Sequence, residues 1–163
     1  MNNNIEASAS SSNNRANIAN ILSTIPVDIY GLIREMGLRV FRGQYDYPDH
    51  DISGQILKDP EKTDQYLIYV NIKHSKTRQR FTAAHELGHY VLHRDKIGDG
   101  ITDNALYRSN LSNEIEWEAN RFAADILMPI DKINHYVSMY GKNVLKLANL
   151  FDVSEHAMTI RLS

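Results

Sequence analysis

The first regular pattern of apolar positions along the chain has helical spacing. Its members recur at steps of three and four residues: Ile29, Leu32, Ile33 and Met36. Pro26 suits the first turn of a helix, because the N–H that proline lacks would have no partner there, and Gly37 is typical of the position just past a helix end. The pattern predicts a helix from about Pro26 to Met36.

Three segments after this helix have the composition of strands. Gln65–Ile72 (QYLIYVNI) is rich in β-branched and aromatic residues and gives the strongest strand signal in the chain. Shorter strands are predicted at Leu38–Phe41 and Ser53–Leu57. Polar, turn-forming segments separate the three, so we expect them to form a small antiparallel sheet.

The rest of the chain is predicted to be mainly helical. A long helix is expected from about Lys76 to Arg94, and a second one, capped by Ser112 or Asn113, ends near Met128. The segment between them, Asp95–Asn110, is polar and contains glycine, and it is predicted to be a loop. Three short helices follow, at about Asp131–Tyr140, Val144–Phe151 and Glu155–Leu162.

Composition divides the chain into three parts. Residues 1–16 are rich in Asn and Ser, and we expect a disordered tail because few apolar side chains are present to offset the entropy of ordering. Residues 17–129 hold the predicted sheet and both long helices. Residues 130–163 form a C-terminal helical segment that resembles a helix-turn-helix. Its last helix offers only Arg161 and His156 as basic groups, so we expect packing or partner docking rather than DNA binding.

Charge and composition limit the classes of function. The formal net charge of −2 argues against broad nucleic-acid binding, which needs a basic excess. The chain has no cysteine, which excludes disulfides, thiolate metal ligands and a cysteine nucleophile. No apolar run approaches the roughly 18 residues of a membrane span, and the N-terminal residues lack the pattern of an export signal. We therefore expect a cytoplasmic protein.

The strongest chemical signal is His85-Glu86-Leu87-Gly88-His89, an H-E-x-x-H pattern on a predicted helix. Residues i and i+4 share one helical face, so both imidazoles can reach a single Zn²⁺ ion at about 2.0–2.1 Å. Glu86 would lie beside the ion, where it could act as general base toward a water molecule. Glycine costs about 1 kcal/mol relative to alanine inside a helix, so we expect a strand or a substrate backbone to approach Gly88 closely.

Catalytic zinc sites have three protein ligands, so one more is needed. His93 is one turn beyond His89, but three successive i+4 side chains of a straight helix cannot reach one ion, and His93 is expected beside the ligands or at the surface. Glu116 and Glu118 are about 200° apart around the next predicted helix, so only one of them can face the metal. Glu116 is preferred, because it shares its face with small residues such as Ala119 and Ala123.

Two supporting roles stay open from the sequence. Asn120, one turn after Glu116, could hydrogen-bond a ligand histidine or could simply pack between helices. A peptidase also needs a donor for the developing oxyanion. Four residues have suitable chemistry and nothing in the sequence chooses among them: Tyr107, Arg108, His135 and Tyr136.

Two stretches of sequence resemble the ImmA/IrrE family of metallo-endopeptidases. The first runs from Gln79 to His93 (QRFTAAHELGHYVLH). The second is Glu116–Ala124 (EWEANRFAA), followed by Leu127-Met128-Pro129. Two motifs in the right order are more specific than either one alone. The resemblance is best over residues 53–129.

This resemblance implies a minimal gluzincin fold, of class α+β, with a small sheet packed on the H-E-x-x-H helix and additional C-terminal helices. It implies that His85, His89 and Glu116 bind one Zn²⁺ ion and that Glu86 is the catalytic base. Family members typically sit beside helix-turn-helix repressors in phages, mobile elements and stress-response systems, and remove the repressor by proteolysis. The implied partner is thus a repressor or an antitoxin-like protein. The alternative is a metal-containing factor that binds protein or DNA with little or no proteolysis.

Overall fold

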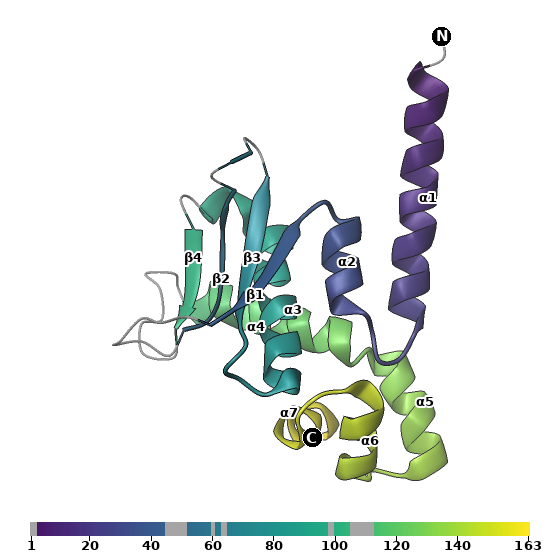
Figure 1. Cartoon of the computed structure of the whole chain (residues 1–163). Coiled ribbons are helices and arrows are strands. Elements are labelled where there is room, and N and C mark those ends of the chain that lie inside the picture. Colours follow the sequence, from purple (N-terminus) through teal and green to yellow (C-terminus); the bar gives the residue numbers. More distant parts are fainter. Residues whose placement is uncertain (1–2, 45–51, 60, 63–64, 98–99, 105–112) are drawn as a thin grey trace.

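The computed structural model describes residues 3–44, 52–59, 61–62, 65–97, 100–104 and 113–163. The helices are α1 Asn3–Ser23, α2 Ile29–Glu35, α3 Lys76–Leu92, α4 Asn113–Leu127, α5 Ile130–Tyr140, α6 Val144–Phe151 and α7 Glu155–Leu162. The strands are β1 Arg39–Gly43, β2 Ile52–Lys58, β3 Tyr66–Asn71 and β4 Gly100–Asn104, and a short 3-10 helix, η1, covers Arg94–Lys96. One sheet packs on α3 and several helices follow it toward the C-terminus, which confirms the α+β class (Figure 1).

The sheet is mixed, so the expectation of a purely antiparallel sheet is wrong. Its strand order is β1-β3-β2-β4, with β2 antiparallel to both of its neighbours and β1 parallel to β3. β1 and β2 do run in opposite directions, as consecutive strands often do. However, β3 lies between them, and Arg39 therefore pairs with Leu67 in a parallel register. The alternation of side chains along a strand carries no information on direction, which is why the sequence did not reveal this pairing.

Strand β4 lies within the segment that was predicted to be a loop. It pairs with β2, with Thr102 opposite Gln55 and Ile101 opposite Ile56. A polar, glycine-containing segment has low strand propensity, but pairing with an existing strand can override that propensity. The loop prediction is therefore wrong for Gly100–Asn104, while residues 98–99 and 105–112 lie outside the described part of the chain.

Helix α2 begins later than the sequence predicts. The carboxylate of Asp28 accepts a hydrogen bond from the Gly31 N–H at 2.9 Å and caps a helix that starts at Ile29, so Pro26 precedes the helix rather than opening it. The predicted end is confirmed, because Gly37 has a positive φ of 80° just past Glu35.

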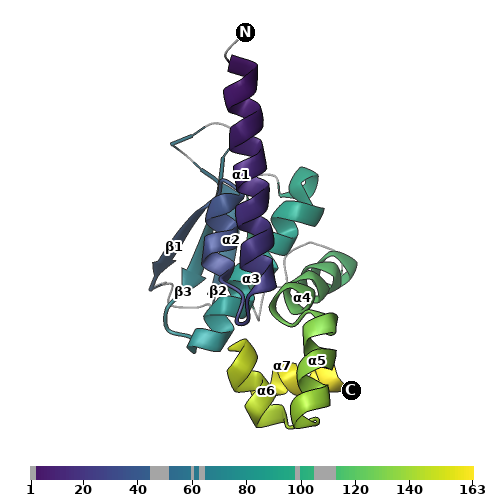
Figure 2. The same cartoon turned by 90° about the vertical axis from the view of Figure 1, so that its right-hand side faces the viewer.

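Helix α1 covers most of residues 1–16, the segment for which the sequence predicts a disordered tail. The backbone is helical from Asn3 onward, and α1 stands beside α2 and projects past the rest of the chain (Figure 2). Its C-terminal part is anchored, since Ile18 and Leu22 pack against the core and the Asn14 amide donates to the Glu35 carbonyl at 2.9 Å. Helix propagation costs little once one end is fixed, which explains how an Asn- and Ser-rich segment can continue it.

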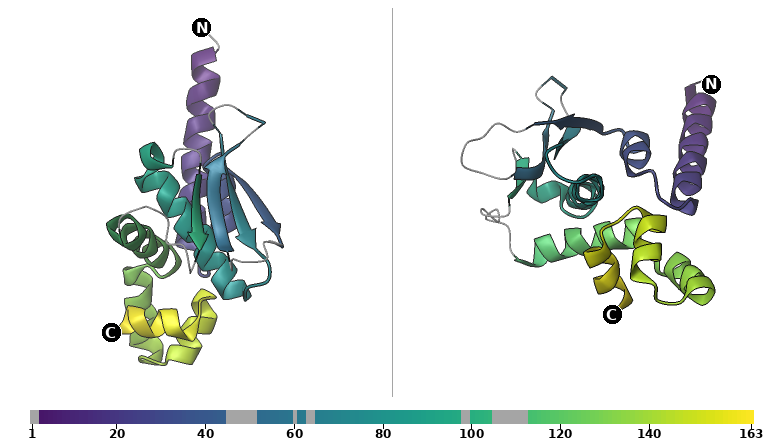
Figure 3. Two further views of the ribbon diagram at one scale, coloured as in Figure 1. Left: turned by 90° about the vertical axis from the view of Figure 1, so that its left-hand side faces the viewer. Right: turned by 60° about the horizontal axis from the view of Figure 1, so that its bottom comes forward.

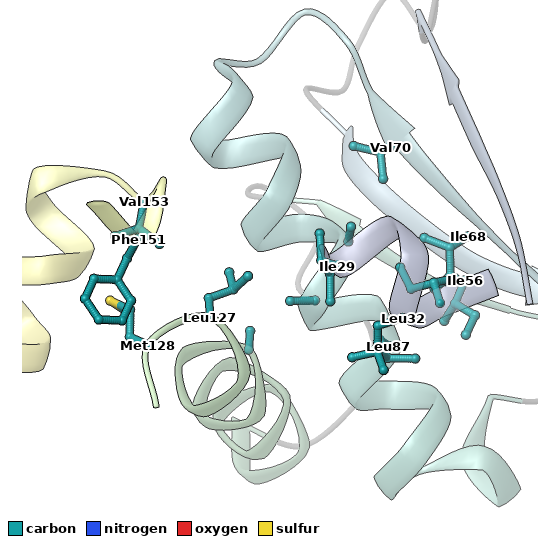
Figure 4. Close-up of a cluster of buried hydrophobic side chains, with 14 of the residues drawn as sticks. Ile29, Leu32, Ile56, Ile68, Val70, Leu87, Leu127, Met128, Phe151 and Val153 are labelled. Carbon is teal, nitrogen blue, oxygen red and sulfur yellow. The ribbon is translucent and has the colours of Figure 1, made fainter. Parts of the chain in front are cut away.

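Helix α3 lies between the sheet and α4, and this layering positions the candidate site (Figure 3). The Ser75 hydroxyl caps α3 by accepting from the Arg78 N–H. Leu87 of α3 belongs to one buried cluster with Ile56 and Ile68 of the sheet (Figure 4). This apolar contact with the sheet helps to fix the position of α3.

The C-terminal helices share that hydrophobic cluster. Phe151 and Val153 are buried in it together with Leu127 of α4 (Figure 4). Met158 of α7 belongs to the same cluster. Arg80 of α3 also ties this segment down, because its guanidinium donates to the Asp152 carbonyl at 3.0 Å. No helix within the described ranges is long and apolar enough to cross a membrane.

Candidate metal centre

Helix α3 places His85 and His89 one turn apart on one face, as their spacing predicts. Their Nε2 atoms are 3.0 Å apart, and both side chains are buried. The rings meet edge to face, with centroids 4.6 Å apart, so the two nitrogens converge on one point.

Glu116 of α4 completes the cluster. Its Oε2 atom lies 3.3 Å from His85 Nε2, and its Oε1 atom lies 3.6 Å from His89 Nε2. In a tetrahedral site with metal–ligand bonds of about 2.0–2.1 Å, neighbouring donor atoms are about 3.3–3.4 Å apart. The spacing and the imidazole–carboxylate chemistry therefore fit a zinc ion. His85, His89 and Glu116 form a candidate metal site, with donor atoms all within 4.8 Å of one another.

The electrostatics of the cluster favour the neutral form of the His89 imidazole, which is the form that binds a metal. Burial, followed by the neighbouring His85, lowers the pKa of His89 to about 4, although Glu116 opposes the shift. His89 is therefore neutral at pH 7 and can offer a lone pair.

A close approach between α3 and α4 sets the distance from Glu116 to the histidines. A Cβ atom on Gly88 would lie 3.2 Å from both the Cα and the carbonyl oxygen of Ala119, which is one turn after Glu116. The sequence predicted a close approach at Gly88 but assigned it to a strand or a substrate. The structure shows that the approaching backbone is α4.

Glu86 of α3 lies against strand β2 of the sheet. It is fully buried, and a Cβ atom on Gly54 of β2 would come within 3.4 Å of its Oε1 atom and would collide with the Thr82 side chain. Gly54 therefore leaves room for the Glu86 carboxylate between α3 and β2. This role of Gly54 was not predicted, and its signal in the sequence was an isolated glycine within a predicted strand.

Asn120 contacts a metal-site histidine, which answers one question that the sequence left open. Its Oδ1 atom lies 3.1 Å from His85 Nδ1, the ring nitrogen that is not in the cluster. With Nε2 free to bind a metal, Nδ1 carries the proton and donates it to Asn120.

His93 and Glu118 lie next to the cluster but outside it. The Nδ1 atom of His93 is 3.4 Å from that of His89, and its Nε2 atom is 2.8 Å from Glu118 Oε2. The sequence anticipated a position beside the ligands for His93. The contact of His93 with Glu118 was not predicted, since Glu118 was considered only as the alternative to Glu116.

The remaining candidates of the sequence analysis are placed in part. Tyr107 and Arg108 lie outside the described residues. Tyr136 packs edge to face against Phe151, with ring centroids 5.8 Å apart, and stacks on Tyr140, so its contacts lie among the C-terminal helices. His135 contacts the ring of Tyr136.

Arg161, one of the two basic groups of the last helix, is paired within the fold. Arg161 donates to Asp125 at 2.8 Å and to the Met128 carbonyl at 2.9 Å, so its charge is used within the fold. Because Met158 of the same helix is buried in the core, α7 is engaged in packing.

An H-E-x-x-H helix whose histidines meet a glutamate from the following helix defines the gluzincin class of metal centre. The chain belongs to the IrrE N-terminal-like domain family (Peptidase_M78), whose model matches residues 34–163. The resemblance to the ImmA/IrrE family that was drawn from the two motifs is thereby confirmed.

Two characterised relatives are similar over part of their length. Metallopeptidase ImmA of Bacillus subtilis (strain 168) is 29% identical over 111 residues, which are 66% of this chain and 62% of ImmA. The radiation response metalloprotease IrrE of Deinococcus radiodurans is 37% identical over 94 residues, 56% of this chain and 27% of IrrE. The chain thus spans less than two thirds of either relative.

Among solved structures, a Mycobacterium tuberculosis transcriptional regulator has a similar fold. Its TM-score is 0.57 at 20% identity, over 85% of this chain and 40% of the regulator. At this identity, the likeness concerns the fold alone.

Proposed function

We propose that this protein is a zinc-dependent endopeptidase. The observation that carries the proposal is the convergence of His85, His89 and Glu116 at the spacing of a tetrahedral zinc site, with Glu86 beside it on the same helix. A purely structural metal site has no need of Glu86, whose side chain is fully buried although burying a carboxylate costs free energy. The names of the two relatives, a metallopeptidase and a metalloprotease, support the same reaction.

The proposed chemistry assigns a distinct task to each group. When bound, zinc supplies a Lewis acid that polarises a carbonyl and lowers the pKa of water to about 7. His85, His89 and Glu116 hold the ion, and Asn120 keeps the His85 proton on Nδ1. Glu86 takes a proton from the attacking water and delivers it to the leaving amine nitrogen, so that the C–N bond breaks and a carboxylic acid and an amine form.

The proposed substrate is a specific regulatory protein, a helix-turn-helix repressor or an antitoxin-like partner. This part of the proposal rests on the family resemblance. The C-terminal helices support docking of a protein rather than of DNA, because Arg161 is already paired with Asp125. We therefore infer that the protein does not bind nucleic acid directly.

The test is to incubate the purified chain with the helix-turn-helix regulator encoded beside its gene, with zinc and with a chelator. The length of the regulator is followed by mass spectrometry. Cleavage at one site with zinc, and none with the chelator, is the expected result. An intact regulator under both conditions, despite a measurable complex, would favour a metal-containing binding protein.

A further inference from the structure

We propose that His93 and Glu118 fix the ring orientation and the tautomer of His89, so that both are positioning residues for the metal site although neither is a ligand. This inference rests on the metal site proposed above. It adds two residues, one from each of the helices that build the site.

The three side chains form an unbroken series of contacts. His89 directs Nε2 toward the metal cluster and Nδ1 toward His93 Nδ1, at 3.4 Å. The other nitrogen of His93, Nε2, lies 2.8 Å from Glu118 Oε2. Both histidines are buried, whereas 44% of the Glu118 side chain is exposed, so the series runs from the metal site to the surface.

The direction of these hydrogen bonds follows from metal binding. A His89 that binds through Nε2 must carry its proton on Nδ1 and must donate it. His93 can accept this hydrogen bond from the His89 N–H only if its own Nδ1 is unprotonated. The proton of a neutral His93 must then be on Nε2. That N–H then donates to the Glu118 carboxylate, a charge-assisted bond that favours this tautomer. In this arrangement His89 donates to His93, and His93 donates to Glu118, which only accepts.

The end of α3 explains how a third histidine at i+4 can reach the second one without reaching the metal. The helix ends at Leu92, and His93 has left helical geometry, with φ −131° and ψ 26°, while its N–H still donates to the His89 carbonyl at 2.9 Å. The His93 ring is therefore turned toward α4, where Glu118 is located.

Helix α4 contributes to the site twice as a result. Glu116 supplies a donor atom directly, and Glu118, two residues later, holds His93. A shift of α4 along α3 would disturb both contacts together. The two helices lie side by side (Figures 2 and 3).

The test measures zinc affinity of the full chain by competition with a chelator of known affinity. His93→Phe keeps a ring of similar size but cannot accept the hydrogen bond, and we expect a 10- to 100-fold weaker affinity. His93→Gln can accept from His89 and donate to Glu118, so we expect an affinity within about threefold of wild type. Glu114→Ala, on the exposed side of α4, is the matched control and should bind as wild type does.

Several outcomes would overturn the inference. His93→Phe with a native circular dichroism spectrum and wild-type affinity would do so, and so would equal losses in His93→Phe and His93→Gln, because loss of packing would then suffice. If His93→Phe does not fold, the ¹⁵N shifts of the imidazoles in the zinc-loaded wild type decide. We expect protons on His89 Nδ1 and His93 Nε2, and a proton on His93 Nδ1 would refute the proposal. A wild-type chain that binds no zinc would overturn the metal site as well.

Discussion

Gly88 of α3 faces Ala119 of α4 so closely that a Cβ atom at position 88 would lie 3.2 Å from the Ala119 backbone. Such a contact is tighter than van der Waals packing allows without adjustment, so a side chain there must move one helix. Glu116 is one turn from Ala119, and its distance to both histidines therefore depends on this contact.

The first prediction concerns Gly88→Ala. We expect zinc affinity to fall by about tenfold, since α4 would move by a few tenths of an ångström. The melting temperature should change little, because the higher helix propensity of alanine, about 1 kcal/mol, offsets the cost of this movement. The control is Gly43→Ala, where a Cβ atom meets nothing within 4 Å. Equal affinity of the Gly88→Ala and wild-type chains would show that this contact does not set the site.

The second prediction concerns the ligands. Elemental analysis of the purified wild type should give about one zinc per chain, and His85→Ala, His89→Ala and Glu116→Ala should each lose it, because each removes one of three donors. Glu118→Ala should weaken binding by only about tenfold, since it acts through His93. If Glu118→Ala loses zinc and Glu116→Ala retains it, the two glutamates must exchange roles.

The third prediction concerns acid and the metal-free protein. Burial lowers the pKa of His89 to about 4 in the fold, whereas an unfolded histidine has a pKa of about 6.5. As the pH falls, the unfolded chain therefore takes up the His89 proton before the folded chain does. The contribution of neutral His89 to the free energy of unfolding is complete above about pH 6.5 and is lost as the pH falls toward 4. With a chelator present, the melting temperature should drop by several degrees between pH 7.5 and pH 5.

Two matched variants show whether His89, rather than another titrating group, causes this dependence of melting temperature on pH. His89→Gln should show a flatter dependence of melting temperature on pH, whereas His135→Gln, at an exposed position on α5, should behave as wild type does. A metal-free wild type that melts at the same temperature at both pH values would contradict the assignment.

The fourth prediction concerns α1. Among the described side chains, the contacts that hold this helix begin at Asn14 and continue through Ile18 and Leu22. Deleting residues 1–12 should thus leave the melting temperature within about two degrees of wild type. Deletion through residue 22 should lower it clearly, because apolar burial is lost. A large drop from the shorter deletion would show that the first turns of α1 are packed.

The sequence predicted the candidate site well because most of it depends on helix geometry. The i, i+4 spacing of His85 and His89, and the helix phase that favours Glu116 over Glu118, are properties of a single helix. The contact between His93 and Glu118 could not be predicted, because it depends on where α3 ends and on how α4 lies against it. Similarly, the room that Gly54 leaves for Glu86 depends on how closely the sheet packs on α3.

Much of the fold was also predictable, with errors where pairing decides the outcome. The strongly patterned segments, such as Tyr66–Asn71 and Lys76–Leu92, are a strand and a helix as expected. The parallel pairing of β1 and the polar strand β4 both depend on neighbours that a local pattern does not identify.

The fifth prediction tests the central claim, that Glu86 beside this metal site makes the protein a peptidase. Glu86→Gln should fold and bind zinc as wild type does, because Glu86 is not one of the three clustered donors and the amide is nearly isosteric. It should still bind the regulator but should not cut it, because an amide cannot accept the proton from the attacking water. A general base raises the rate of such a reaction by about 10²- to 10⁴-fold.

The measurement is co-expression of the neighbouring regulator with the wild-type chain and with Glu86→Gln, followed by mass spectrometry of the regulator. The account predicts a regulator cut at one position by the wild type and left intact, in a complex, by Glu86→Gln. A regulator cut equally by both chains would place the chemistry outside Glu86, and a regulator left intact by both would contradict the peptidase assignment.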